Sequence, residues 1–210
     1  MKSALFAGLI FIAACERTGG ELPYYLTPEL TPEFVSRDIA AGPDVHRVGE
    51  FSLVRSDESV LTESALDEKV SVVHFFFTEC SGVCPKTQPN LAWLLKQLPN
   101  ENEIQILSHS VKPSDDSVAA LRDYAAHHHI SDRRWILLTG AMPEIEKVAG
   151  QYYYANLNDG RSYGVTDLAH TETLYLVDGD RRIRGVYNGT LRLDVERLRD
   201  DAARLLKRQH

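Results

Sequence analysis

The chain has 210 residues, of which 43% are hydrophobic and 25% are charged, and its formal net charge at neutral pH is −7. This length and composition suit one globular domain preceded by a targeting segment. The acidic balance argues against nucleic acid as a partner, because binding to phosphate backbones calls for an excess of Lys and Arg.

The first fifteen residues read as a signal peptide. Lys2 precedes an apolar run of about ten residues, which is too short to cross a bilayer and is typical of an export signal. The run ends in the sequence IAAC at residues 12–15, which resembles a bacterial lipobox, where the cysteine is acylated and becomes the first residue. We therefore expect an exported protein of the bacterial cell envelope, anchored to a membrane by a lipid on Cys15. The alternative is ordinary cleavage with an unmodified Cys15.

Residues 16–47 are expected to be a tether, because prolines and glycines recur along them and interrupt any long helix or strand. The aromatic residues Tyr24, Tyr25 and Phe34 predict that part of this tether packs against the domain. Removing residues 1–14 would take away Lys2 and no acidic residue, so the net charge would fall from −7 to −8.

The domain, which we place at residues 48–210, is organised around a strand and the helix that follows it. Residues 70–77 (VSVVHFFF) are apolar apart from one serine and one histidine, which predicts a central strand buried on both faces. Residues 86–98 predict a helix, because leucines recur there at positions i, i+3, i+4 and i+7.

Cys80 and Cys84 lie between this strand and this helix. If the first helical turn extends back through the loop, their spacing puts both sulfurs on one side of the N-terminal end of the helix. The helix dipole and the free backbone N–H groups favour the thiolate there, which is both nucleophile and metal ligand. The pattern predicts a paired-thiolate site at the carboxyl end of a buried strand, where open α/β folds bind ligands. The alternative is two buried cysteines or a structural disulfide.

The rest of the domain alternates strands and helices. Ser114 is expected to cap a helix, with Asp115 and Asp116 in its first turn. The alternation predicts a central mixed sheet with helices on both faces. We expect strands at residues 48–54, 103–111 and 135–139, a helical turn at 62–68, helices at 114–127 and 143–152, a hairpin of strands 173–177 and 182–187, and a closing helix at 191–207.

The sequence TECSGVCP at residues 78–85 follows an aromatic strand and resembles the TxCxxxCP motif of the Sco/SenC family, the copper-handling proteins of cytochrome c oxidase assembly. The third functional residue of that family is a histidine just before a late strand, and His170 in the sequence AHTETLYLVD has that place. The resemblance covers roughly residues 45–207. It implies a thioredoxin-like fold with an N-terminal β-hairpin and an inserted helix near residues 114–127.

The resemblance also implies that Cys80, Cys84 and His170 bind copper. Two thiolates and an imidazole suit copper, Cu(I) most of all, whereas a closed zinc site would need a fourth ligand. With Cys15 assigned to the lipid, the two motif cysteines are the only ones left. In an oxidising compartment we expect this pair to form a disulfide unless a reductant or a metal holds it. Without the resemblance, His170 would be interpreted as a surface histidine.

We therefore expect a membrane-anchored metallochaperone, rather than an enzyme, that delivers copper to the copper-bearing subunit of a haem–copper oxidase. The alternative is a thiol–disulfide oxidoreductase that reduces a partner through Cys80 and Cys84. His170 discriminates between the two, because imidazole takes no covalent part in thiol exchange. A peroxidase is a weaker third interpretation, because a CxxxC pair does not match a single peroxidatic cysteine.

Five further residues are given smaller roles. Asp167, three residues before His170, either orients the loop or hydrogen-bonds a metal ligand, or it is a solvated loop acid. Thr78 and Glu79 flank Cys80, and either is placed to hydrogen-bond a thiolate without being a metal ligand. His74 is expected to be a hydrogen-bonded core residue, and His109 is kept as a weak candidate for a group behind the ligands.

Overall fold

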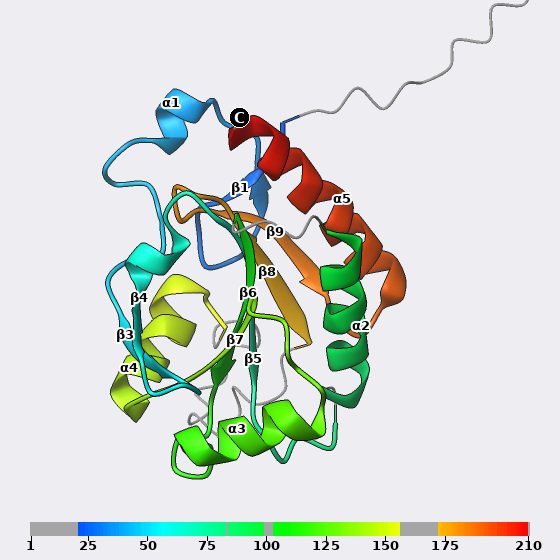
Figure 1. Cartoon of the computed structure of the whole chain (residues 1–210). Helices are drawn as coiled ribbons and strands as arrows, with labels where there is room; N and C mark the ends of the chain where they lie inside the picture. Colours follow the sequence, from blue (N-terminus) through cyan, green and yellow to red (C-terminus); the bar gives the residue numbers. More distant parts are fainter. Residues whose placement is uncertain (1–20, 83, 99–102, 156–171, 210) are drawn as a thin grey trace, which may run out of the picture.

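The structure, a computed structural model, describes residues 21–82, 84–98, 103–155 and 172–209. Its centre is a mixed sheet in the order β4-β3-β7-β6-β5-β8-β9 (Figure 1). The strands β5, β6 and β7 run parallel, and β3, β8 and β9 join them by antiparallel pairing. The strands are β3 (Ser52–Arg55), β4 (Val60–Thr62), β5 (Val70–Phe76), β6 (Ile104–Ser110), β7 (Trp135–Thr139), β8 (Thr173–Val177) and β9 (Ile183–Asn188).

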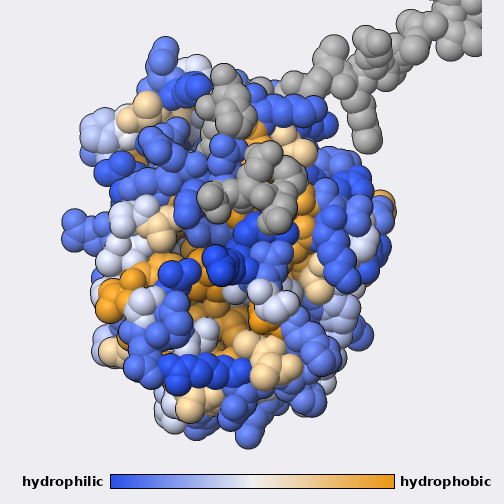
Figure 2. Space-filling view, in the orientation of Figure 1, coloured by the Kyte–Doolittle hydropathy of each residue, from blue (hydrophilic) through white to orange (hydrophobic). Residues whose placement is uncertain are grey.

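Helices cover both faces of the sheet, as the alternating pattern predicts. One face packs against α2 (Cys84–Gln97), α3 (Val118–His127) and α5 (Arg192–Gln209). The other packs against α4 (Met142–Lys147) and the π-helical turn η2 (Val148–Tyr152) that continues it. Figure 2 shows polar side chains over most of one side of the molecule, with hydrophobic ones gathered in a hollow. None of the helices among the described residues is long and apolar enough to cross a bilayer.

Strand β5 lies inside the sheet and contributes to both cores. All seven of its residues are buried, and it pairs with β6 on one side and β8 on the other. Val72 and Phe76 belong to the core under α2 and α5, whereas Val73 and Phe75 belong to the core under α4. Alternate side chains of a strand point to opposite faces, so a strand buried on both sides is apolar at almost every position.

The predicted start of the helix after β6 is wrong. The helix α3 begins at Val118, and its N-cap is Ser117, whose hydroxyl accepts a hydrogen bond of 3.2 Å from the Ala120 N–H. Ser114 lies in a turn instead, and Asp116 is buried rather than exposed in a first helical turn. The Asp116 carboxylate accepts hydrogen bonds from residues outside the helix, which are described below. A local sequence pattern carries no information about such distant partners.

The N-terminal hairpin is shorter and later than the predicted strand. The strand expected at residues 48–54 is observed as β3 at Ser52–Arg55, and it pairs with β4, which extends to Thr62. The helical turn expected at residues 62–68 is the 3₁₀ turn η1 (Glu63–Leu66).

The segment before this hairpin is attached to the body of the domain. The guanidinium of Arg184 in β9 donates to the carbonyl oxygens of Leu22 and Pro23, at 2.6 and 3.0 Å, and lies over the Tyr24 ring. Tyr24 is 3% exposed, as its aromatic character predicted, but Phe34 is 77% exposed, so the prediction of packing fails there. The short helix α1 (Arg37–Ala40) and a small sheet of β1 (Tyr24–Tyr25) and β2 (Pro32–Glu33) complete this segment.

Arg184 also forms a buried ion pair with Asp178, with 2.9 Å between Nη1 and Oδ2. Burial raises the pKa of Asp178 even though Arg184 acts in the opposite direction. Replacing Arg184 with Met would take the cation from the buried Asp178 carboxylate, which keeps the N–H donors of Asp180 and Arg182, and would take the guanidinium donor from the Leu22 and Pro23 carbonyls. We expect the free energy of unfolding in urea to fall by about 3–5 kcal/mol.

The matched control is Arg197→Met, because the Arg197 guanidinium is 68% exposed and pairs with Asp194 at a similar distance, 2.9 Å. We expect the control to cost less than about 1 kcal/mol, since water screens an exposed pair. Equal losses for the two variants would contradict the role given to Arg184.

Candidate metal centre

The two motif cysteines lie in the loop that leads from β5 into α2. Cys80 is 9% exposed and belongs to the core under α4, and Cys84 is partly buried between the two cores. Neither forms a disulfide in the structure, and their thiols share a hydrogen bond. Gly82 and Ser81 beside them are exposed. The loop therefore opens to solvent over a pair of thiols that face each other.

The expectation that the helix N-terminus keeps the thiols as thiolates is wrong for Cys84. Burial, followed by the hydrogen bond with Cys80 and its charge, raises the pKa of Cys84 to about 12. Backbone hydrogen bonds of Phe77 and Cys84 lower this pKa, but less than burial raises it. The reduced Cys84 is thus a neutral thiol at neutral pH, and it must lose its proton before it binds a metal.

Asp116 fixes the loop that carries the cysteines. Its carboxylate is 1% exposed and accepts from the backbone N–H of Thr78, at 3.2 and 3.3 Å, and from the Thr78 hydroxyl at 2.5 Å. The Ser110 hydroxyl, at the end of β6, donates to the other carboxylate oxygen. One buried carboxylate therefore joins the ends of β5 and β6 two residues before Cys80.

Lys112 also contacts the start of this loop, at Phe77. Its ammonium group lies 4.1 Å from the centre of the Phe77 ring, and its backbone N–H donates to the Ser110 hydroxyl at 3.1 Å. Neither role of Asp116 and Lys112 was predicted from the sequence. The one available signal was that both lie in the connection that follows the strand β6, where polar side chains meet the end of the neighbouring parallel strand.

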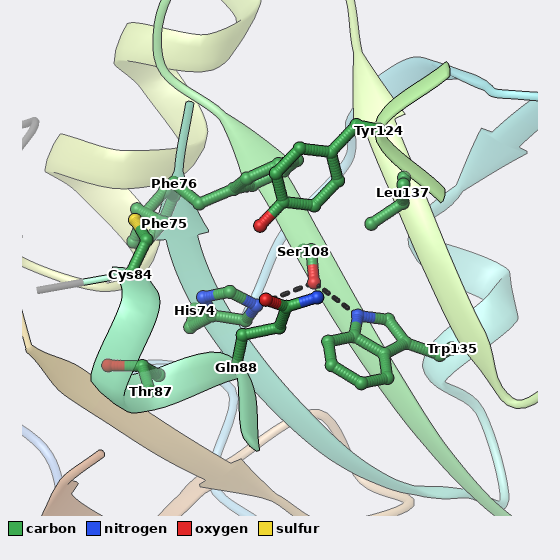
Figure 3. Close-up of a pocket in the computed structure, with 10 residues that line it drawn as sticks. All are labelled: His74, Phe75, Phe76, Cys84, Thr87, Gln88, Ser108, Tyr124, Trp135 and Leu137. Atoms are coloured by element: carbon green, nitrogen blue, oxygen red, sulfur yellow. Dashed lines mark hydrogen bonds between the residues drawn. The ribbon is translucent and has the colours of Figure 1, made fainter. Parts of the chain in front are cut away.

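A small cavity lies behind Cys84, on the α2 and α3 side of the sheet (Figure 3). In it the Ser108 hydroxyl joins His74, with 2.5 Å to Nε2, and Trp135, whose indole N–H donates at 2.8 Å. Burial lowers the pKa of His74 to about 4, so this histidine is neutral and hydrogen-bonded in the core, as expected. The cavity volume of about 10 Å³ suits one water molecule and excludes an organic substrate.

His109 faces the other core, where its ring packs against Phe75 and Tyr153. Burial lowers its pKa to about 3, and neither ring nitrogen has a hydrogen-bond partner in the part of the chain that the structure describes. No three His, Cys, Asp or Glu side chains among these residues come together as a metal site. The described residues therefore supply a dithiol, and they place no histidine beside it as a third ligand.

Three residues singled out in the sequence lie outside the described residues: Cys15, Asp167 and His170. The described chain resumes at Glu172, directly before β8. The backbone carbonyl of Glu172 accepts a hydrogen bond of 2.6 Å from the Gly189 N–H.

The sequence matches a family model described as SCO1/SenC over residues 40–207. A relative from Bacillus subtilis, the SCO1 protein homolog, is 29% identical over 88% of this chain and 86% of its own length. A mitochondrial SCO1 homolog from Arabidopsis thaliana is 27% identical, and the match covers 90% of this chain and 58% of that longer protein.

Solved structures of similar fold support the same assignment. A SCO1/SenC family lipoprotein from Bacillus anthracis is 27% identical, with a TM-score of 0.66 over 77% of this chain and 95% of that one. BsSco, in which a disulfide switch is identified, is a member of the Sco family of cytochrome c oxidase assembly proteins. It is 27% identical, with a TM-score of 0.62 over 75% of this chain and 92% of that one. Arabidopsis thaliana ScoI with copper bound is 26% identical, with a TM-score of 0.60 over 76% of this chain and 98% of that one.

These likenesses confirm the thioredoxin-like class that the sequence predicted for the mixed sheet. The family model covers far more than half of the chain, including both motif cysteines. The chain belongs to the SCO1/SenC family.

Proposed function

We propose that this chain is a copper chaperone that holds its metal through Cys80, Cys84 and His170 and delivers it to the copper centre of a haem–copper oxidase. A lipid on Cys15 would keep the domain at the membrane of the cell envelope, facing outward. The observation that carries the proposal is the pair of facing thiols in an open loop above a buried strand end.

The donor set suits a soft cation. Thiolate sulfurs favour Cu(I), and the two thiols already lie close enough to share a hydrogen bond. Similar proteins support copper as the cargo, since Arabidopsis ScoI is solved with copper bound. Membership of BsSco in a family of oxidase assembly proteins supports the recipient, and the Bacillus anthracis lipoprotein supports the anchor.

The register of the sheet supports His170 as the third ligand. Strand β8 runs antiparallel to β5, with Tyr175 opposite Val73 and Val177 opposite Ser71. The beginning of β8 therefore lies at the end of β5 that leads into the cysteine loop. The described chain enters β8 at Thr173, at the same end of the sheet as the thiols, and His170 precedes Thr173 by three residues in the sequence.

A thiol–disulfide oxidoreductase remains the second candidate, because facing thiols also form a disulfide readily. The disulfide switch of BsSco is consistent with redox chemistry in a similar chain. The raised pKa of Cys84 makes its thiolate scarce, and both candidate functions need that thiolate, so the two are separated by the role of His170 instead.

Either cysteine alone should be insufficient for copper. We expect anaerobic titration of the reduced protein to give one equivalent of tightly bound copper in the wild type and none in Cys80→Ser or Cys84→Ser. Ser81→Ala, in the same exposed loop, serves as the control and should bind like the wild type. A single-cysteine variant that retains one tight copper would contradict a shared site.

His170→Ala should separate the two candidate functions. A dithiolate alone tolerates Cu(I) but serves Cu(II) poorly, because Cu(II) prefers nitrogen or oxygen donors. We expect the variant to lose Cu(II), to bind Cu(I) more weakly and still to form the disulfide between Cys80 and Cys84. Oxidase assembly in cells should then fail, whereas His128→Ala, at the C-cap of α3, should support it.

If oxidase assembly stays normal with His170→Ala but fails with either cysteine variant, the chaperone function is refuted and the oxidoreductase function takes its place. The comparison works because imidazole takes no covalent part in thiol exchange.

Asp116→Asn should loosen the loop without removing a ligand. Groups that support metal ligands typically contribute about 10–100-fold to affinity, and we expect a loss in that range for copper with the stoichiometry unchanged. Asp115→Asn is the matched control, because Asp115 is exposed and its carboxylate contacts the neighbouring Ser114 hydroxyl. Competition with a chelator measures the affinities, and equal affinities for the two variants would refute the role of Asp116.

A further inference from the structure

Four basic side chains line one hollow at the end of the sheet where the parallel strands begin. Arg55 ends β3, Lys69 directly precedes β5, and Arg133 and Arg134 directly precede β7. The hollow has a volume of about 290 Å³, close to the lower limit of about 300 Å³ for typical ligand sites. Among the described residues that line it there is no Asp or Glu. The charged part of this lining is therefore entirely cationic, on a chain whose net charge is −7.

Three of these four cations have no counter-charge in the described part of the chain. Arg55, Lys69 and Arg133 form no ion pair with any residue that the structure describes. Arg134 differs, because its Nε and Nη2 donate to the two carboxylate oxygens of Asp132 at 3.0 and 2.7 Å. Arg55 and Lys69 are half-buried, so water screens their charges less than it screens charges on an open surface. A bound anion would therefore stabilise the hollow.

Two acids that are close to the hollow in the sequence are already engaged. Asp57 lies within electrostatic reach of Arg55, but its carboxylate accepts hydrogen bonds from the Ser59 backbone and hydroxyl. Glu63, which lies between two lining residues in the sequence, pairs with Arg181 at 3.9 Å. Neither carboxylate lines the hollow, so neither competes with a ligand inside it.

Hydroxyl groups add neutral donors to these charges. The Thr62 and Ser64 hydroxyl oxygens, both in the lining, lie 2.8 Å apart and share one hydrogen bond. That bond uses one of the two hydroxyl protons and leaves the other for a ligand. A guanidinium donates two parallel hydrogen bonds to an oxyanion, and a lysine ammonium acts as a point charge. We infer that this hollow is a binding site for a phosphate group, whose several oxygens accept from all these donors together.

The N-terminal segment is attached at the same end of the sheet as the hollow. Strands β5 and β9 run parallel with their starts level, because both pair antiparallel with β8. Arg184 near the start of β9 therefore holds Leu22 and Pro23 at the end of the sheet where the parallel strands begin. The cysteine loop leads from β5 into α2 at the opposite end (Figure 1).

This placement indicates where the phosphate group comes from. Cys15 lies seven residues before Leu22, a stretch that spans at most about 25 Å when fully extended. With the lipid on Cys15 proposed above, the cationic end of the sheet lies close to the lipid headgroups and the thiols face away from them. The expected ligand is therefore the phosphodiester of an anionic phospholipid, with free phosphate as its soluble equivalent. This source rests on the proposed anchor, whereas the site itself does not.

The first test titrates inorganic phosphate into the reduced full chain and follows the unfolding midpoint. Phosphate should raise the midpoint more than sodium chloride does at equal ionic strength, because a bound ligand stabilises the folded chain beyond screening. Arg55→Gln/Arg133→Gln should weaken the apparent affinity for phosphate about tenfold or more, since hydrogen bonds from charged groups contribute on that scale. Arg133→Glu, at an exposed position that the fold does not depend on, should weaken it as well.

The matched control is Arg37→Gln/Lys96→Gln, which removes the same charge from two exposed positions that do not line the hollow. This control should bind phosphate like the wild type. Equal effects of phosphate and chloride on the wild type would overturn the site, and so would an unchanged affinity in Arg55→Gln/Arg133→Gln.

The second test separates the two sources of the phosphate group. The full chain is incorporated into vesicles of phosphatidylcholine, with or without phosphatidylglycerol, so that any membrane anchor is the same in both. Backbone hydrogen exchange at residues 133–135 should slow when phosphatidylglycerol is present, and Arg55→Gln/Arg133→Gln should remove the difference. Slowing by inorganic phosphate alone would assign the site to free phosphate, and no slowing with either would overturn the site.

Copper titration shows separately whether the proposed function holds. Arg55→Gln/Arg133→Gln should still bind one equivalent of copper, and Cys84→Ser should lose copper but keep phosphate binding. Failure of the phosphate titration would thus overturn the phosphate site and leave the chaperone function standing. Copper binding that survives in Cys84→Ser would contradict the chaperone function and leave the phosphate site standing.

Discussion

The buried carboxylate of Asp116 is the constraint on which the geometry of the candidate site depends. It accepts hydrogen bonds from the Thr78 backbone and side chain and from the Ser110 hydroxyl, so it ties the loop after β5 to the end of β6. Parallel strands end at the same edge of a sheet, and their connections diverge there unless something joins them. The junction leaves the residues from Cys80 onward in a defined place while the loop tip at Gly82 stays exposed.

The chemistry of the site follows from burial, which disfavours charged side chains at this end of the sheet. Burial keeps the reduced Cys84 protonated, and it keeps His74 and His109 neutral in the two cores on either side of the sheet. A soft cation bound to both sulfurs offsets part of the thiolate charge where it forms, because one Cu(I) on two thiolates leaves a single negative charge, whereas a free dithiolate would carry two. The same pair also has a covalent alternative, because facing thiols close to a disulfide when oxidised. The candidate site is therefore suited to switch between a metal-bound dithiolate and a metal-free disulfide.

Much of the sheet could be predicted from the sequence, because hydrophobic periodicity reflects burial directly. The strand predicted at residues 70–77 is observed at Val70–Phe76, and the strand at 135–139 agrees with β7 at both ends. The paired thiols also follow from the spacing of the motif. Local patterns could not show that Asp116 turns inward, because Ser114 and two acids are equally typical of a helix start. The pKa of Cys84 was predicted in the wrong direction, since the local dipole argument leaves out tertiary burial.

The central claim is that two cysteines and one histidine hold copper in this chain. X-ray absorption at the copper edge, on the reduced full chain loaded with Cu(I), tests it most directly because it reports the atoms bound to the metal. The account predicts two sulfur ligands and one imidazole nitrogen, with the nitrogen lost in His170→Ala. A spectrum without sulfur ligands, or one that His170→Ala leaves unchanged, would contradict it.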